Sequence, residues 1–247
     1  RIGPMATVTT LTLFLTVPHG LLMCNRAPRN TRTVPAGRSL VMTAGGPPLP
    51  SEPLGYAWGA MVNTKPVIDI FLDLSCPFSA KAFHTLYPAT KAGGVLADQA
   101  SFVLYNVVQP WHSQSTVMHE SAFAVRNLAP DDYLAYVDAV FAKLMTDFTN
   151  EAVRDETRGQ TASRLAALAE ETTRLSASEV KEQLAHTGTG NDGCAVSQMI
   201  RWATKYHRAR GVHVTPTVFV NGIEAPQISS SWTVEQWLAL LNELAAA

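Results

Sequence analysis

The fold is decided by one stretch of sequence, Val67-Ile68-Asp69-Ile70-Phe71-Leu72-Asp73-Leu74-Ser75-Cys76-Pro77-Phe78-Ser79. Its first half is apolar and rich in β-branched side chains, which predicts a short buried strand. A helix is expected from Ala80 to about Tyr87. Cys76 therefore lies at a strand-to-helix turn, with Pro77 in the first turn of the helix, where a missing N–H costs nothing. We expect the free amides and the dipole of this helix start to stabilise a thiolate at Cys76.

A second stretch of the same kind lies far downstream, at residues 211–222. It contains the Thr215-Pro216 step, which is followed by β-branched and aromatic residues that predict a strand over Thr217 to Val220. The Asn221-Gly222 pair then predicts a tight hairpin turn.

Taken together, the two stretches resemble the thioredoxin-like superfamily, in particular its DsbA-like branch. The resemblance implies an α/β thioredoxin-like fold with an α-helical insertion between the strands of the core. It also implies an active site made of a Cys-Pro-x-Cys sequence at a helix start and a distant cis-proline before a strand. The resemblance covers Lys65 to Tyr87 and Gly211 to Ala245. This chain departs from the pattern at one position, since Ser79 replaces the second cysteine and the motif reads Cys-Pro-Phe-Ser.

The middle of the chain fits this fold in outline. Ser101 to Val108 is predicted to be a second core strand, parallel to the first and joined to it by a right-handed βαβ connection. Residues from about 113 to 193 show helical patterns, which correspond to the insertion. A long helix is expected from Asp192 to Arg210, and the closing helix starts with the capping pair Thr233 and Gln236.

The N-terminal segment differs in composition from the rest of the chain. No Asp or Glu occurs from Arg1 to Ser51, whereas that segment holds five Arg. This composition is typical of organelle transit peptides, and the apolar residues 11–17 look like a signal-peptide core. We predict a cleaved or disordered targeting leader with a Pro/Gly-rich linker over residues 1–52, and a plastid or mitochondrial destination, with a secretory route as the alternative. The folded domain is predicted over residues 56–247, with residues 56–63 as either an edge strand or a loop.

Composition limits the partners and cofactors. The formal net charge of -1 gives no basic patch, so a nucleic-acid partner is not expected. No apolar run reaches the ~18 residues that a membrane span requires. The seven His show no metal-ligand spacing, so the sequence predicts no metal site and no bound cofactor. Of the three Cys, Cys24 lies in the predicted leader, which leaves too few for a disulfide framework.

Cys76 is the candidate nucleophile, although a lone cysteine is more often a small buried hydrophobe. Ser79 takes the place of the resolving thiol, and a serine hydroxyl cannot release a mixed disulfide by attacking it. The sequence therefore predicts a thiol-disulfide oxidoreductase of monothiol type that acts on protein or glutathione mixed disulfides. Such a protein needs an outside thiol, such as glutathione as a co-substrate. Ser79 is also a candidate hydrogen-bond donor to the Cys76 thiolate.

Four residues are candidates for substrate binding. If Pro216 is cis, as the resemblance implies, the Thr215 backbone lies beside Cys76, where an extended peptide or glutathione can pair with it. Phe78 and Trp111 are further candidates for substrate contact, and packing in a turn is the alternative for Trp111.

Two other residues allow more than one interpretation. Asp73 matches an acid that DsbA-like sequences carry three residues before the cysteine, where its charge tunes the thiol; a solvated loop acid or a helix N-cap is the alternative. Cys194 is either a distant resolving thiol for Cys76 or a buried structural cysteine.

Three rival functions stay open. A glutathione-dependent transferase or isomerase of the kappa-like kind shares this fold, and Ser75 or Ser79 would then organise the glutathione thiol. A catalytically silent structural or assembly subunit is the second rival. Iron-sulfur carriage is the third, because Cys-Pro-Phe-Ser looks like the Cys-Gly-Phe-Ser of monothiol glutaredoxins, although the long helical insertion argues against it. The sequence does not determine the physiological substrate or the oligomeric state.

Overall fold

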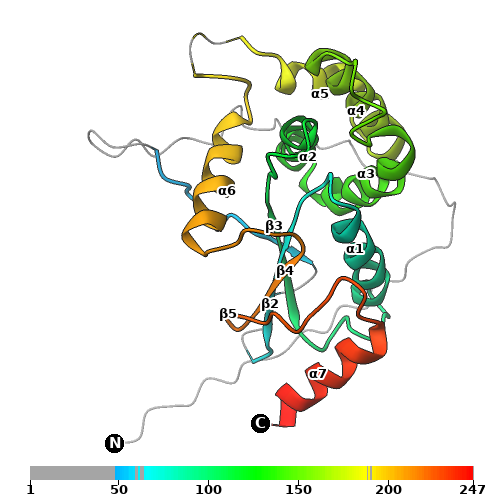
Figure 1. Cartoon of the computed structure of the whole chain (residues 1–247), viewed down its shortest axis with the longest axis vertical. Coiled ribbons are helices and arrows are strands. Elements are labelled where there is room, and N and C mark those ends of the chain that lie inside the picture. Colours follow the sequence, from blue (N-terminus) through cyan, green and yellow to red (C-terminus); the bar gives the residue numbers. More distant parts are fainter. Residues whose placement is uncertain (1–47, 59–60, 62–63, 188, 190, 247) are drawn as a thin grey trace, which may run out of the picture. The chain divides into compact units, whose positions relative to one another are not determined.

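The computed structural model describes residues 48–58, 61, 64–187, 189 and 191–246. Its strands are β1 (Tyr56–Trp58), β2 (Val67–Leu72), β3 (Ser101–Asn106), β4 (Thr217–Val220) and β5 (Ile223–Glu224). Its helices are α1 (Pro77–Thr90), α2 (Ser115–Leu128), the 3-10 helix η1 (Pro130–Asp132), α3 (Tyr133–Asp147), α4 (Arg158–Thr172), α5 (Ala177–Leu184), α6 (Ser197–Ala209) and α7 (Val234–Ala246) (Figure 1).

The predicted leader and linker lie outside the described residues as far as residue 47. From there on the chain contacts the domain. The carbonyl of Pro48 accepts a hydrogen bond from Trp202 Nε1 of α6 at 2.8 Å, and Arg126 of α2 donates to the carbonyls of Leu54 and Gly55. Among the helices of the described part, none has the length and apolar character that a membrane span needs.

The five strands form one mixed sheet in the order β1-β3-β2-β4-β5. β2 and β3 are parallel and are connected through α1, which confirms the predicted βαβ unit. β4 pairs antiparallel with β2, and β5 returns along β4 across the predicted Asn221-Gly222 turn. Both turn residues have a positive φ, as this tight hairpin turn requires. Residues 56–58 form an edge strand antiparallel to β3.

The sheet buries apolar side chains on both faces because successive residues of a strand point to opposite sides. Ile68, Ile70 and Leu72 of β2 belong to the main core, which also contains buried residues of α1 and α7. Phe71 points the other way and packs in a smaller cluster that includes Tyr206 of α6. Figure 1 shows α6 on one side of the strands and α1 and α7 on the other.

The predicted insertion is helical, with α2 to α5 packed on one another. Tyr136 of α3 joins three of these helices, since its buried hydroxyl donates to Ser121 Oγ of α2 at 2.9 Å and lies 3.1 Å from the carbonyl of Leu165 in α4. Two capping boxes fix the starts of α4 and α5, at Thr157 and Ser176. Each box satisfies backbone donors that a helix start otherwise leaves free.

The boundaries of two helices differ from the sequence-based expectation. α1 begins at Pro77 rather than Ala80 and continues past Tyr87 through Pro88 to Thr90, and its buried face extends to Ala89. α6 begins at Ser197 rather than Asp192. The reason for the second difference is Gly193, whose φ of 73° lies in the left-handed region, outside helical geometry. A bend at Cys194 and a turn at residues 195–196 therefore lead into α6.

Candidate functional site

Cys76 lies where β2 ends and α1 begins. It is the N-cap residue of α1, with extended backbone angles, and Pro77 follows at the first helical position. No acidic side chain lies in the first turn of the helix to offset its positive end. The N–H of Cys76 donates to the carbonyl of Asp73 at 3.0 Å, which closes the turn between strand and helix. Cys76 is not disulfide-bonded and retains 7% of its surface exposed.

The pairing of β2 with β4 brings the second predicted stretch to Cys76. Phe71 near the end of β2 lies opposite Thr217 at the start of β4, so the residues before Thr217 meet the residues after β2. The Thr215-Pro216 peptide bond is cis. Cys76 Sγ lies 3.4 Å from the carbonyl oxygen of Thr215 and donates to it. Two segments 139 residues apart thus form one site.

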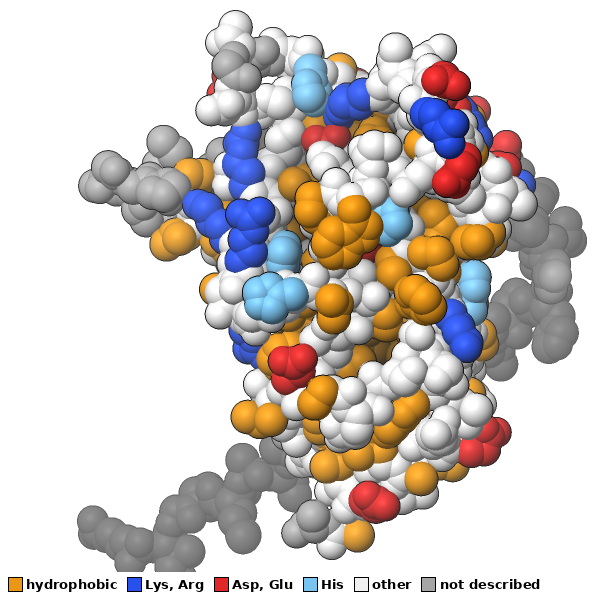
Figure 2. Space-filling model, in the orientation of Figure 1, with side chains coloured by type: hydrophobic (Ala, Val, Ile, Leu, Met, Phe, Trp, Pro, Cys, Tyr) orange, Lys and Arg blue, Asp and Glu red, His pale blue; other side chains and the backbone are white. Residues whose placement is uncertain are grey.

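Exposed apolar side chains lie near this pair in the sequence or in a loop that contacts the Thr215 loop. Phe78, two residues after Cys76, is 63% exposed, and Val214, next to Thr215, is 62% exposed. Trp111, 58% exposed, follows β3 in a loop that contacts the Thr215 loop, because Gln109 Nε2 donates to the carbonyl of His213 at 3.2 Å. Figure 2 shows hydrophobic side chains gathered in the centre and lower part of the viewed face, with Lys and Arg along the left border and others at the top and right.

Ser79 is fully buried in the first turn of α1. Its hydroxyl accepts a hydrogen bond from the N–H of Asp73 at 3.2 Å. Within the described residues no hydrogen bond joins Ser79 to Cys76. The donor role that the sequence suggested for Ser79 is therefore not seen; the hydroxyl instead fixes the backbone between strand and helix.

A network of buried polar side chains contacts the turn between β2 and α1. Asp73 is fully buried, and its Oδ1 accepts from the N–H of Ser75 at 2.9 Å and from Ser115 Oγ at 2.7 Å, with His119 Nε2 at 3.2 Å. Asp73 Oδ2 is buried with no hydrogen-bond partner among the described residues. Asp73 is therefore neither a solvated loop acid nor a side-chain cap of α1. It connects the turn that carries Cys76 to α2.

The network continues through His119 to Tyr133. The N–H of Leu74 donates to His119 Nε2 at 3.2 Å, and His119 Nδ1 lies 2.9 Å from Asn106 Nδ2. Tyr133 donates to Asn106 Oδ1 at 3.0 Å. Burial raises the pKa of Tyr133 to about 12, so its hydroxyl keeps the proton that it donates. Sequence reasoning missed His119, Asn106 and Tyr133. The sequence offered two signals for these residues. Asn106 is a polar residue near the end of a predicted core strand, and His119 lies within a helix of buried residues.

Replacing Asp73 with Ala should destabilise the fold by about 3–5 kcal/mol, because it removes the acceptor shared by the buried donors of Ser75 and Ser115. Urea unfolding measures the loss. Asp138→Ala is the matched control, since Asp138 is a half-exposed acid that lies 3.7 Å from His84 and contributes about 0–1 kcal/mol. Equal, small losses in the two variants would show that the buried carboxyl does not hold the turn.

His207 near the end of α6 makes stability depend on pH. It is buried; its backbone carbonyl accepts from the N–H of Val212 at 2.9 Å, which supports the loop leading to Thr215. Burial lowers its pKa below the usual 6.5. The carbonyl of Val212 opposes this shift, whereas the charges of Arg208, His119 and His213 lower the pKa further.

A lowered folded-state pKa means that the folded chain resists protonation at His207 more than the unfolded chain does. Stability is then fully present above pH 6.5 and is lost as the pH falls below 6.5 toward the folded-state pKa. We expect His207→Gln to flatten this part of the curve of unfolding free energy against pH. An unchanged slope below pH 6.5 would assign the dependence to other groups.

This architecture also occurs in known proteins. The sequence profile of one protein family, described as Thioredoxin, matches residues 59–243. No curated protein matches the sequence. Among solved structures, a protein from Pseudomonas syringae that is provisionally named a protein-disulfide isomerase is 25% identical, with a TM-score of 0.60; the match covers 75% of this chain and 97% of that chain.

Two further solved structures show the same fold at lower identity. BdbD from Bacillus subtilis is 16% identical with a TM-score of 0.62, over 78% of this chain and 94% of that chain. DsbA from Chlamydia trachomatis is 16% identical with a TM-score of 0.56, over 77% and 91%. The predicted DsbA-like thioredoxin fold with its helical insertion is confirmed. These relatives do not support a plastid or mitochondrial destination, and the secretory alternative stays a prediction.

Proposed function

Because this chain belongs to the thioredoxin family, we propose that it is a thiol-disulfide oxidoreductase in which Cys76 is the attacking nucleophile. The observation that carries the proposal is the position of Cys76 Sγ, at the start of α1 and 3.4 Å from the carbonyl of Thr215. The thiolate is the form of a cysteine that attacks a disulfide, and Pro77 with the unpaired backbone amides of the first turn of α1 follows Cys76 directly. The provisional name of the Pseudomonas syringae relative agrees with this reaction class.

The proposed reaction uses one protein thiol. The Cys76 thiolate attacks one sulfur of a partner disulfide, a mixed disulfide forms, and the other partner sulfur leaves as a thiolate that takes a proton from solvent. A second thiol, such as glutathione, then attacks the partner sulfur of the mixed disulfide and regenerates the Cys76 thiolate. Ser79 takes no part in this exchange, because a hydroxyl cannot replace a thiol as the attacking group.

The surroundings of Cys76 suit an extended partner. The Thr215 backbone precedes β4, and a peptide or glutathione backbone can pair there as an added strand. Phe78 and Trp111 offer exposed apolar surface, and we assign them to partner contact. Protein disulfides and glutathione mixed disulfides both meet these requirements.

The kappa-like alternative is weakened by the position of its two candidate serines. The hydroxyl of Ser75 is buried and donates to Met118 Sδ at 3.1 Å, and Ser79 is buried against the N–H of Asp73. Neither hydroxyl is presented to a ligand thiol.

The proposal is tested by mapping where a disulfide reagent attaches. Wild-type protein is treated with a slight excess of oxidised glutathione and digested under acid conditions, and the peptides are weighed by mass spectrometry. We expect the glutathione adduct on the peptide that contains Cys76, before any adduct on the peptide with Cys194. Labelling of Cys194 first, or of neither cysteine, would remove the basis for Cys76 as the nucleophile.

A further inference from the structure

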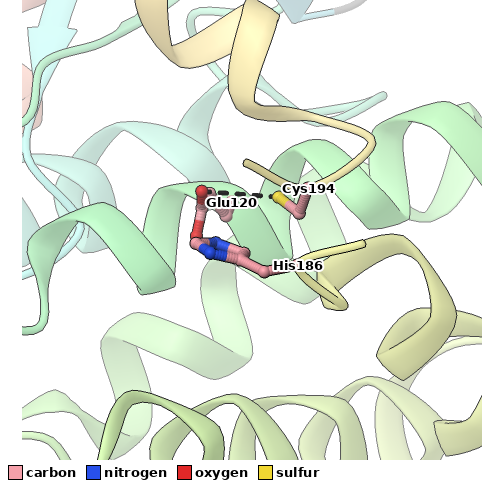
Figure 3. A group of neighbouring side chains, drawn as sticks. All are labelled: Glu120, His186 and Cys194. Carbon is pink, nitrogen blue, oxygen red and sulfur yellow. Dashed lines mark hydrogen bonds between the residues drawn. The ribbon is translucent and has the colours of Figure 1, made fainter. Parts of the chain in front are cut away.

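A second group of reactive side chains lies outside the Cys76 site. Glu120 belongs to α2, His186 follows α5, and Cys194 precedes α6. Each offers one ligand atom, a carboxylate oxygen, a ring nitrogen and a sulfur, and these atoms all lie within 4.8 Å of one another. Figure 3 shows the three side chains turned toward a common point from separate parts of the chain.

The carboxylate at the centre of this group is buried and held in place. Glu120 is 3% exposed, and its Oε2 is paired with Arg158, which also donates to the carbonyl of Leu184 at 3.2 Å. The other oxygen, Oε1, accepts from Cys194 Sγ at 3.4 Å and from Ser197 Oγ at 3.2 Å. Arg158 therefore pairs with only one carboxylate oxygen of Glu120. The other oxygen, which faces Cys194, accepts hydrogen bonds from neutral donors, and a cation can displace these donors.

The sulfur is held by a similar set of contacts. Cys194 is buried, and its Sγ lies 3.3 Å from Ser197 Oγ, which also accepts from the N–H of Cys194 at 2.9 Å. Contacts of this kind, from side chains that do not touch a metal themselves, orient the ligands of a metal site. His186 is exposed, so one side of the group is open to an ion from solvent.

We propose that Glu120, His186 and Cys194 form a Zn²⁺ site. Carboxylate oxygen, imidazole nitrogen and thiolate sulfur are the three ligand types that Zn²⁺ accepts in proteins, and four-coordinate Zn²⁺ then takes one water. Binding replaces the Cys194 thiol proton, which goes to solvent, and the Cys194 thiolate and the Glu120 carboxylate then face both the ion and Arg158. The sequence predicted no metal site because its ligands are distant in the chain and match no known spacing.

Zn²⁺ at this position joins the segment between α5 and α6 to α2. It also makes Cys194 a metal ligand, which removes it as a resolving thiol for Cys76. The proposal does not depend on the reaction proposed for Cys76, because no residue is shared between the two sites.

The test uses the full chain with Cys24→Ser and Cys76→Ser, so that Cys194 is the only thiol. Titration with Co²⁺ should give a thiolate-to-metal charge-transfer band, and calorimetry should show one Zn²⁺ bound per chain with release of one proton. The melting temperature should rise with Zn²⁺ concentration, because the ion binds the folded chain.

Two further variants in this background decide the outcome. Cys194→Ser should abolish the charge-transfer band, and His186→Ala should weaken Zn²⁺ binding by at least about tenfold, the scale on which even the groups around metal ligands act. His186 is exposed, so its loss does not threaten folding. His84→Ala, at another exposed His, should change nothing. Absence of the band in the parent, or Zn²⁺ affinity unchanged by His186→Ala, would overturn the proposal.

Discussion

Replacing Cys76 with Ser should reduce disulfide exchange to the uncatalysed background. The substitution keeps the size and the helix-start position of the side chain but removes the sulfur that forms the mixed disulfide. The measurement is the release of glutathione from a glutathionylated peptide, followed with excess reduced glutathione as the final thiol. The unfolding free energy should change little, because Sγ makes a single long hydrogen bond, to the carbonyl of Thr215.

The matched control is Cys24→Ser, which removes a thiol from the predicted leader and should leave the rate unchanged. A Cys76→Ser protein that still exchanges disulfides would locate the chemistry elsewhere. A Cys76→Ser protein that conjugates glutathione at the wild-type rate would favour the kappa-like transferase or isomerase. Two equally inactive proteins, wild type and variant, that also co-purify with a large complex would favour the catalytically silent structural or assembly subunit.

Local sequence predicted the parts of the fold whose signals are local. The apolar run from Val67 to Leu72 predicted strand β2, and the Asn221-Gly222 pair predicted the hairpin of β4 and β5. Both predictions were possible because backbone preferences act within a few residues. The contact between Cys76 and Thr215 has no such local signal in the sequence. It depends on the antiparallel pairing of β2 with β4, which neither stretch encodes alone; only the family resemblance supplied it.

The contacts among the buried polar residues could not be predicted from the sequence. Asp73 and His119 are 46 positions apart, and neither carries a pattern that predicts the other. Their contact requires that α2 pack against the turn that carries Cys76, which is a result of tertiary packing. The group of Glu120, His186 and Cys194 was missed for the same reason. The extension of α1 through Pro88 shows that packing, here of Ala89, can override a residue that usually ends a helix.

Ser79 determines whether the site works with one thiol or two. It stands at the third helical position after Cys76, and a disulfide can bridge this spacing, since side chains three residues apart on a helix are neighbours. A thiol held there would attack a Cys76 mixed disulfide within the same molecule. Such a group acts at an effective concentration far above that of free glutathione in solution.

We therefore expect Ser79→Cys to convert the protein into a dithiol enzyme. A mixed disulfide between Cys76 and a peptide should accumulate in the wild type without added thiol. In the variant it should be released at least about tenfold faster than ~1 mM glutathione releases it from the wild type, because the attack is intramolecular. Stopped-flow kinetics of peptide release and the mass of the oxidised product measure both effects.

The cost of this change should be small, about 1 kcal/mol, because only the hydrogen bond from the N–H of Asp73 to the Ser79 hydroxyl is weakened. Ser79→Ala is the control: it loses the same hydrogen bond without gaining a thiol and should show no faster release. If Ser79→Cys forms no disulfide between Cys76 and the introduced thiol and releases the peptide no faster than Ser79→Ala, the missing second thiol is not what limits the site. The claim that Ser79 determines whether the site works with one thiol or two would then be wrong, because a thiol at position 79 would be unable to reach Cys76.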